Sequence, residues 1–283
     1  MKVKRIAELE LIIVPDEAEP GAAAVMVDGS IGSQPYRFLL DTGAATTTVV
    51  FDDHTAKLPV TGRKSSSGVF GQSADDLITV PHLTAGPISK RDFQIARLAQ
   101  GAEARDNLLG MDCLKDAGWH FDFGRGKGGR IELLEGMQDD SWEELYMDAK
   151  SHPYVEVGLD GTTLDAVWDT GAGVTVVDES LVAQHPTCFH PSGTSSGTDS
   201  SGATVETEMW MVEGLTIGGK MFRQHKVATV DLSHVNVGLE LPMSLILGFT
   251  TLILSPWSMD FPGRRWRLGR LNENHSLTPS SGR

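Results

Sequence analysis

Short stretches in which apolar and polar residues alternate recur along the chain, and this period of two predicts β-strands. Residues 22–30 (AAAVMVDGS) and 154–162 (YVEVGLDGT) both carry the pattern, and both contain an Asp-Gly turn signal near their end. Residues 34–43 (QPYRFLLDTG) and 162–171 (TTLDAVWDTG) then read as return strands. The pattern therefore predicts two similar β-hairpins, one in each half of the chain.

The remaining pattern also favours strands joined by turns. Residues 64–76 and 192–206 are rich in Gly and Ser and lie between strand-like runs, so we expect them to form the tips of hairpins. Short helices are predicted at residues 111–118 and 178–185. The 31 glycines and the many short Val/Ile/Leu runs favour an all-β protein.

Three landmarks recur in the same order along the chain, which indicates an internal duplication. Two Asp-Thr-Gly segments lie 128 residues apart, and two Gly residues that follow apolar pairs lie 138 residues apart. Two Trp residues, each followed by an Asp-Phe pair, keep the same spacing of 138. The pairs are Asp41 and Asp169, Gly110 and Gly248, and Trp119 and Trp257.

The landmarks divide the chain into two lobes and a connection. We expect a first lobe at residues 1–133, an inter-lobe connection at 134–152, a second lobe at 153–271 and a flexible tail at 272–283. The connection is acidic and repeats no landmark, and we expect it to be partly helical. The N-terminal run 1–14 is compatible with a first strand or with a removable pro-piece.

Charge and composition argue against some kinds of partner and indicate where the protein is located. The net charge of −14 argues against binding to a phosphate backbone, so no nucleic-acid partner is expected. Glu8 and Glu10 interrupt the first apolar run, and no stretch approaches the roughly 20 apolar residues of a membrane span. Cys113 and Cys188 lie in different halves, so no disulfide framework is expected. We predict a cytoplasmic protein without a membrane partner.

The two Asp-Thr-Gly segments carry the candidate chemistry. An Asp between apolar strands is costly to bury unless it is paired. Gly43 and Gly171 permit close approach of the backbone, and the small residues Ala44 and Ala172 leave space for an opposing loop. If the lobes face each other about a two-fold axis, the two carboxyl groups meet and share a proton above one water molecule.

These residues resemble the aspartic proteases over most of residues 20–270. The Asp-Thr-Gly-Ala form, with Thr47 and Thr175 downstream, is similar to the retropepsin branch, while two lobes in one chain are similar to pepsin. The resemblance implies a bilobal acid-protease fold, with two pseudo-symmetric β-barrel-like lobes and an active-site cleft between them. It also implies an aspartic endopeptidase that needs no cofactor and no metal.

The resemblance assigns roles by position. Asp41 and Asp169 would be the catalytic pair, one accepting a proton from water and the other donating to the peptide carbonyl. Supporting roles fall on Thr42, Gly43, Ala44, Thr170, Gly171, Ala172, Leu109, Gly110, Leu247 and Gly248, of which the two threonines would cross-brace the loops. A substrate-binding flap would include Val69, Phe70 and Gly71. The partner would be a peptide or protein substrate, bound by a monomer that acts as a pseudo-dimer.

Other interpretations stay open at this point. A catalytically silent peptide-binding module would retain the same cleft, and lobes paired between two chains would give a dimer with the same chemistry. Many pepsins carry a hydroxyl residue where this chain has Ala44 and Ala172, so we expect higher carboxyl pKa values and a mildly acidic to neutral optimum. His185, Cys188 and His190 lie close in sequence but have no evident fourth zinc ligand.

Overall fold

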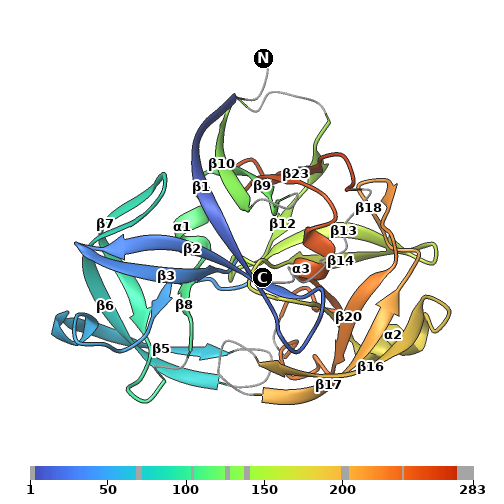
Figure 1. Cartoon of the computed structure of the whole chain (residues 1–283), viewed down its shortest axis with the longest axis horizontal. Helices are drawn as coiled ribbons and strands as arrows, with labels where there is room; N and C mark the ends of the chain where they lie inside the picture. The colour runs from blue at the N-terminus through green and yellow to red at the C-terminus, as the bar shows by residue number, and fades with distance from the viewer. Residues whose placement is uncertain are drawn as a thin grey trace, which may run out of the picture.

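The computed structural model describes residues 4–67, 72–102, 105–124, 128–136, 141–198, 204–237 and 239–272. Its strands form two bodies, one from each half of the chain, with a shared sheet between them (Figure 1). The prediction of an all-β, bilobal architecture is confirmed. In the described part of the chain, no helix has the length and apolar character needed to cross a membrane.

The first half of the chain folds mainly into strands. In order it contains β1 (Lys4–Pro15), β2 (Ala23–Ile31), β3 (Gln34–Leu40), β4 (Thr48–Val49), the 3₁₀ turn η1 (Thr55–Lys57), β5 (Val60–Ser67), β6 (Gln72–Ala85), β7 (Ile88–Arg97), β8 (Asn107–Leu109), α1 (Met111–Leu114), β9 (Gly118–Asp122) and β10 (Gly129–Glu135). The predicted first hairpin is β2–β3, but the predicted turn signal Asp28-Gly29 lies inside β2, and the chain turns at Gly32 and Ser33 instead, where Gly32 has a positive φ of 59°. The predicted helix is the single turn α1.

The second half repeats this order. After β11 (Glu143–Glu144) and β12 (Tyr146–Met147) it contains β13 (Pro153–Leu159), β14 (Thr162–Trp168), β15 (Thr175–Asp178), α2 (Glu179–Gln184), β16 (Phe189–Thr198), β17 (Thr204–Val212), β18 (Thr216–Ile217), β19 (Lys220–Met221), β20 (His225–Val230), β21 (Leu245–Leu247), α3 (Phe249–Leu252), β22 (Trp257–Asp260) and β23 (Arg265–Leu268). The hairpin β13–β14 corresponds to β2–β3.

Each lobe places its Asp-Thr-Gly segment at the end of a central strand. β3 runs parallel to β8, which also pairs antiparallel with β4. β14, β21 and β15 repeat this arrangement in the second lobe. The last residues of β3 and β14 are buried or half-buried on both faces of the strand, which explains the continuous apolar runs before Asp41 and Asp169.

The register of the shared sheet shows the duplication directly. β9 and β22 run antiparallel, with Phe121 opposite Trp257 and Trp119 opposite Met259. His120 lies opposite Ser258, its own counterpart 138 residues later, and their Nδ1 and Oγ atoms are 2.9 Å apart. The pseudo-two-fold axis that relates the lobes therefore passes between these two residues.

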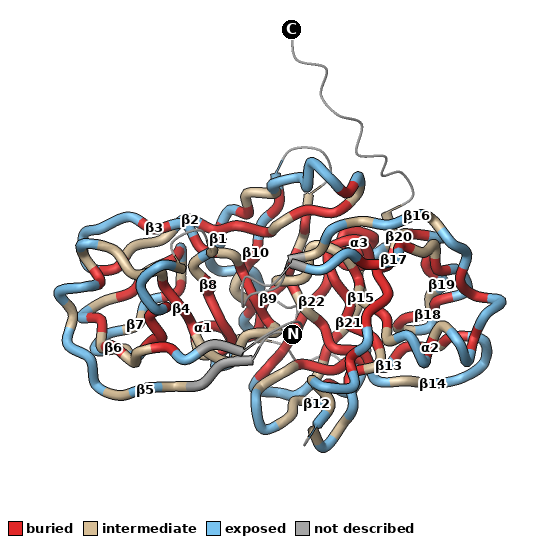
Figure 2. Tube along the Cα trace, turned by 90° about the horizontal axis from the view of Figure 1, so that it is seen from below, coloured by how far each residue is buried: buried red, intermediate tan, exposed pale blue. Residues whose placement is uncertain are grey.

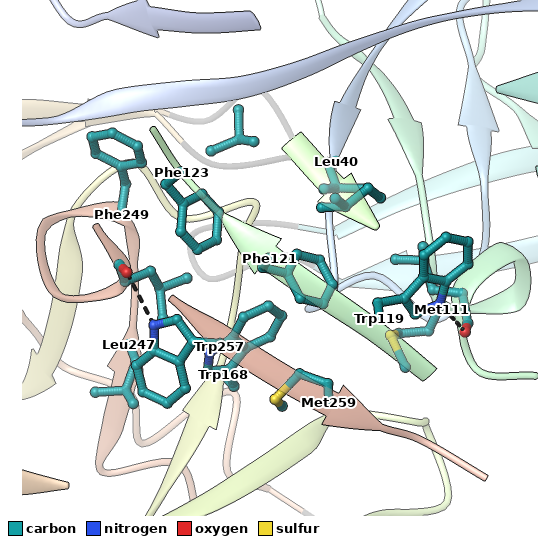
Figure 3. Packing of buried hydrophobic residues seen from close by; sticks show 14 of the residues in the cluster. Leu40, Met111, Trp119, Phe121, Phe123, Trp168, Leu247, Phe249, Trp257 and Met259 are labelled. Carbon is teal, nitrogen blue, oxygen red and sulfur yellow. Dashed lines mark hydrogen bonds between the residues drawn. The ribbon is translucent and has the colours of Figure 1, made fainter. Parts of the chain in front are cut away.

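The face of this sheet that is turned away from His120 carries the aromatic core. Phe121 packs edge-on against Trp168 with ring centroids 4.7 Å apart, and Trp168 contacts Trp257 in the same manner (Figure 3). The indole nitrogens of Trp119 and Trp257 donate to the carbonyls of Leu114 and Leu252, the same contact in both copies. The repeated tryptophans are core residues, and the burial of the centre is visible in Figure 2.

The connection between the lobes differs from our expectation. We predicted a partly helical segment, but its described residues, 134–136 and 141–152, contain the end of β10 and the two short strands β11 and β12 and no helix. β11 pairs with β23 and β12 pairs with β13, while Leu145 between them is buried. Existing sheet edges supply backbone partners to this segment, and that tertiary pairing outweighs its local preference for helix.

Candidate active site

The two Asp-Thr-Gly loops meet at the seam between the lobes and are locked together by their threonines. Thr42 Oγ1 donates to the carbonyl of Trp168 at 2.8 Å, and Thr170 Oγ1 donates to the carbonyl of Leu40 at 2.7 Å. Each hydroxyl also accepts a hydrogen bond from the backbone N–H of the other threonine, at 3.0 and 3.2 Å. The contacts are buried and reciprocal, so each loop fixes the position of the other.

This lock brings the two aspartates face to face. The backbone N–H of Gly43 donates to Asp169 Oδ1 across the seam at 3.1 Å, and the N–H of Gly171 donates to the same oxygen at 2.8 Å. A methyl group added to Gly43 would lie 2.6 Å from Asp169 Oδ2, and one added to Gly171 would lie 2.5 Å from Asp41 Cγ. Each carboxyl group therefore packs directly against the glycine of the opposite loop.

The surroundings favour a proton on this pair. Burial raises the pKa of Asp41 well above its ordinary value, and the charge of Asp169 raises it further. Burial also raises the pKa of Asp169, although hydrogen bonds from the backbone N–H groups of Gly171 and Gly43 and the charge of His152 oppose this rise. As whole residues, Asp41 is buried and Asp169 is half-buried.

The predicted support residues hold both loops from behind. The backbone N–H of Asp41 donates to the carbonyl of Leu109, and that of Asp169 donates to the carbonyl of Leu247, both at 3.0 Å. A methyl group on Gly110 would lie 2.8 Å from the carbonyl oxygen of Ala44, so only glycine fits there. Gly248 has the same relation to Ala172 in the second lobe, at 2.7 Å.

The structure also shows side-chain contacts behind the two loops that the sequence did not predict. Thr47 donates through its backbone N–H and its hydroxyl to the carboxylate of Asp112, with the hydroxyl contact at 2.6 Å. In the second lobe Thr175 contacts the hydroxyls of Thr250 and Thr251 instead. Asp112 and Thr250 share the spacing of 138, so alignment of the two copies would have revealed both partners.

The flap residues Val69, Phe70 and Gly71 lie outside the described residues. The strands that lead to them are described, and β5 pairs antiparallel with β6. In the second lobe β16 pairs with β17 in the same way. Both predicted hairpins therefore exist as paired strands, and their labelled strands β5 and β17 lie along the same edge of the molecule in Figure 1.

The histidines near Cys188 have partners other than a metal. His190 Nε2 lies 3.1 Å from a carboxylate oxygen of Glu213, and His185 Nδ1 lies 3.7 Å from one of Asp160. Within the described ranges, no group of three or more His, Cys, Asp or Glu side chains is arranged to hold a metal ion. Cys113 and Cys188 are both buried free thiols.

Comparison with known proteins agrees with this fold. The chain is similar to the crystal structure of the aspartic proteinase from Irpex lacteus, with 14% sequence identity and a TM-score of 0.59. The alignment covers 95% of this chain and 98% of that one, and at this identity it shows a shared fold. Comparison with curated proteins gives no match.

A family model described as an aspartyl protease matches the chain twice, at residues 25–113 and 155–251. Each match contains one Asp-Thr-Gly loop and the apolar-Gly segment that supports it. The two matches together cover more than half of the residues, and the chain therefore belongs to the aspartyl protease family.

Proposed function

We propose that the protein is an aspartic endopeptidase that hydrolyses peptide bonds with water activated between Asp41 and Asp169. The observation that carries the proposal is the packing of each carboxyl group against the glycine of the opposite loop, in surroundings that raise the pKa of both. Two carboxyl groups so placed titrate as a pair that holds one proton over a range of pH. One then serves as base and the other as acid.

The chemistry follows from that single shared proton. The ionised carboxylate takes a proton from water while the water oxygen attacks the peptide carbonyl carbon, and the protonated carboxyl group donates to the carbonyl oxygen. When the tetrahedral intermediate collapses, the C–N bond breaks and the nitrogen leaves with a proton from the pair. The backbone N–H groups of Gly43, Gly171 and Ala44 hold the carboxylates in place throughout.

The substrate in this proposal is a peptide or an unfolded protein segment. Paired hairpins from both lobes, β5–β6 and β16–β17, supply strand edges beside which an extended chain can lie. Both loops come from one chain, so we propose a monomer. The loop sequences favour a retropepsin-like origin for each lobe of this pepsin-like arrangement, and a cytoplasmic location stays a prediction from sequence.

The proposal is tested by incubating the purified protein with a diverse peptide library between about pH 3 and pH 8 and identifying new termini by mass spectrometry. Asp41→Asn and Asp169→Asn should each lose at least on the order of 10²-fold to 10⁴-fold in cleavage rate. Asp165→Asn is the matched control, because Asp165 is an exposed residue on β14, the strand that leads to Asp169.

The result distinguishes an enzyme from a binding module. Cleavage in the wild type that both site variants abolish supports the endopeptidase. Capture of peptides by the wild type and by Asp41→Asn alike, without new termini at any pH, would show a catalytically silent peptide-binding module and would contradict the proposal.

A further inference from the structure

The shared sheet carries polar side chains at the pseudo-two-fold axis, on the face opposite to the aromatic core. Ser258 on β22 lies opposite His120 on β9 and opposite Arg267 on β23. Residues that lie opposite each other on neighbouring strands point to the same face of a sheet. The next residues along β9 and β22, Phe121 and Trp257, point to the other face and pack against Trp168. His120, Ser258 and Arg267 therefore share the outer face.

This outer face borders a cavity of about 500 Å³, a volume typical of small-molecule sites. The cavity, which we call the axial cavity, is lined by both halves of the chain, and its polar lining includes Arg5, His120, Glu143, Lys220, Ser258 and Arg267. In Figure 1 the labels of β9, β10 and β23 lie at the opposite edge of the molecule from those of β5 and β17. The axial cavity is therefore separate from the candidate active site.

The lining of the axial cavity is positively charged, although the whole chain has a net charge of −14. Its three cationic side chains come from different elements, namely Arg5 from β1, Lys220 from β19 and Arg267 from β23. Among the described residues, Glu143 is the only acidic one in the lining. The cavity therefore favours a ligand of negative charge.

The contacts of these cations are compatible with a bound anion. Arg5 Nη1 lies 2.8 Å from Glu132 Oε2, and the ammonium group of Lys220 donates to the carbonyl of Gly269. A guanidinium has five N–H donors and an ammonium has three, so one contact does not exhaust either group. The guanidinium of Arg267 lies 4.6 Å from the centroid of the Trp142 ring. Stacking of this kind uses the face of the guanidinium and is compatible with hydrogen bonds at its edge.

His120 adds an N–H donor to the cavity. His120 and Ser258 are both at least nine-tenths buried, and His120 Nδ1 lies 2.9 Å from Ser258 Oγ. Among the residues that the structure describes, His120 Nε2 has no hydrogen-bond partner. When Ser258 donates to Nδ1, the proton of the neutral imidazole is on Nε2 and is available to a ligand. Burial, followed by the charge of Arg5 and a smaller effect of Arg267, lowers the pKa of His120 to about 4, so both guanidinium groups act on this one point.

We propose that the axial cavity binds a small anion with two or more negative charges, such as an organic phosphate or a polycarboxylate. Arginine and lysine side chains from three elements would contact the charged groups of this ligand, and His120 would donate to it from the sheet. The proposal does not depend on the proposed function, because neither Asp41 nor Asp169 lines the cavity.

Isothermal titration calorimetry with two simple probes, sodium pyrophosphate and sodium citrate, tests the proposal. The ionic strength is held at about 0.15 M in all titrations, so that general screening is the same for both probes. We expect the wild type to bind at least one probe with a Kd below about 1 mM. Tighter binding of pyrophosphate would indicate a phosphate ligand, and tighter binding of citrate would indicate a carboxylate ligand.

Two variants and one matched control test whether the cavity is the site. Arg5→Gln and Arg267→Gln should each weaken binding of the probe by about tenfold, because a charge-assisted hydrogen bond is lost. Arg37→Gln is the matched control and should bind like the wild type. Arg37 also lies 2.8 Å from a carboxylate oxygen, that of Asp28, and its side chain is about as exposed as that of Arg5, but it belongs to β3 and lies outside the axial cavity.

A second measurement locates the bound probe directly. The protein is labelled with ¹³C in its histidine rings, and the signal of His120 is assigned from its absence in His120→Gln. Addition of the probe that binds should move the signal of His120, because this imidazole lines the cavity. The signal of His234, an exposed residue outside the axial cavity, should stay in place.

The outcomes are independent of peptide cleavage. The proposal is overturned if neither probe binds the wild type below about 10 mM. It is also overturned if Arg37→Gln weakens binding as much as Arg267→Gln, or if binding leaves the His120 signal unchanged, because the probe would then be attracted by surface charge elsewhere. A protein that binds the probe but cleaves no peptide would retain this site and lose the proposed function, and the reverse result would do the opposite.

Discussion

At the scale of single residues, the glycines at the seam show how closely the lobes must approach. Gly43 and Gly171 both have ordinary backbone angles, so neither is needed for conformational freedom. They are needed for space, because a methyl group at either position would overlap the opposite carboxyl group. The distance between the two acids is therefore set by the smallest side chain available.

We expect Gly43→Ala to lower kcat/KM by about 10²-fold or more, because the added methyl group must displace the Asp169 carboxyl group. Steady-state kinetics on a cleaved peptide would measure the loss. Gly62→Ala is the control, since a methyl group there would meet Leu77 Cδ1 at 3.5 Å, an ordinary contact. Equal activity of the two variants would show that the carboxyl groups are not confined by the glycines.

The raised pKa of Asp41 also predicts how stability depends on pH. A carboxyl group whose pKa is higher in the folded state contributes stability at low pH and loses it as pH rises through the folded pKa. The free energy of unfolding of the wild type should therefore fall relative to Asp41→Asn as pH increases above about 4. Urea unfolding at a series of pH values tests this. If the free energy of unfolding changed with pH in the same way in the wild type and in Asp41→Asn, the prediction would be contradicted. Asp165→Asn is the control, and it should follow the wild type.

At the scale of elements, two buried histidines connect neighbouring strands and helices. His225 on β20 places Nε2 2.8 Å from Thr251 Oγ1 in α3, and His120 on β9 contacts Ser258 on β22. Burial lowers the pKa of each imidazole to about 4. Both side chains are therefore neutral in the folded protein at mildly acidic pH, where the same residues in an unfolded chain take up protons.

These two histidines make stability change with pH in the opposite direction to Asp41. Stability from each histidine is complete above the unfolded pKa near 6.5 and is lost as pH falls toward 4, by about 3 kcal/mol for a shift of this size. We expect the pH dependence of urea unfolding between these values to be smaller in His225→Gln than in the wild type. His234→Gln, a variant at an exposed histidine, should keep the wild-type dependence. A dependence that is the same in all three proteins would rule out a contribution from His225.

Elements with a local pattern could be predicted from the sequence, whereas elements that depend on distant partners could not. The hairpins β2–β3 and β13–β14 were predicted from their alternating residues, and the second of them turns at its Asp-Gly signal, residues 160 and 161. The helices α1 and α2 lie where short helices were expected, whereas α3 was not predicted. The strands β11 and β12 have two residues each, and only the edges of existing sheets make them strands. A helix was therefore the wrong prediction for the described part of that connection.

The same distinction applies to the site. The Asp-Thr-Gly-Ala repeat was sufficient to predict which loops meet and which threonines cross-brace them. Asp112 was missed because its partner Thr47 lies 65 residues away, and only an alignment of the two copies, in which Asp112 matches Thr250, indicates that they are partners.

At the scale of the whole molecule, the lobes are joined by more than the site. β9 and β22 share one sheet, Phe121 of the first lobe packs against Trp168 of the second, and Lys226 of the second lobe forms an ion pair with Glu19 of the first. Together with the reciprocal threonine bonds, these contacts complete the site within one chain. A second copy of the chain is not required to supply either carboxyl group.

This organisation predicts that activity does not depend on protein concentration. Both loops belong to one 30.5 kDa chain, so kcat per chain should stay constant when the enzyme is diluted from micromolar to nanomolar concentrations. Sedimentation equilibrium over the upper part of that range should give the mass of a single chain. If lobes instead paired between two chains, dilution would separate them, and activity per chain would fall together with the mass. A fall in both activity and mass would therefore show that the site forms between two molecules. Constant activity per chain and the mass of a single chain are expected, because the contacts between the two lobes lie within one chain.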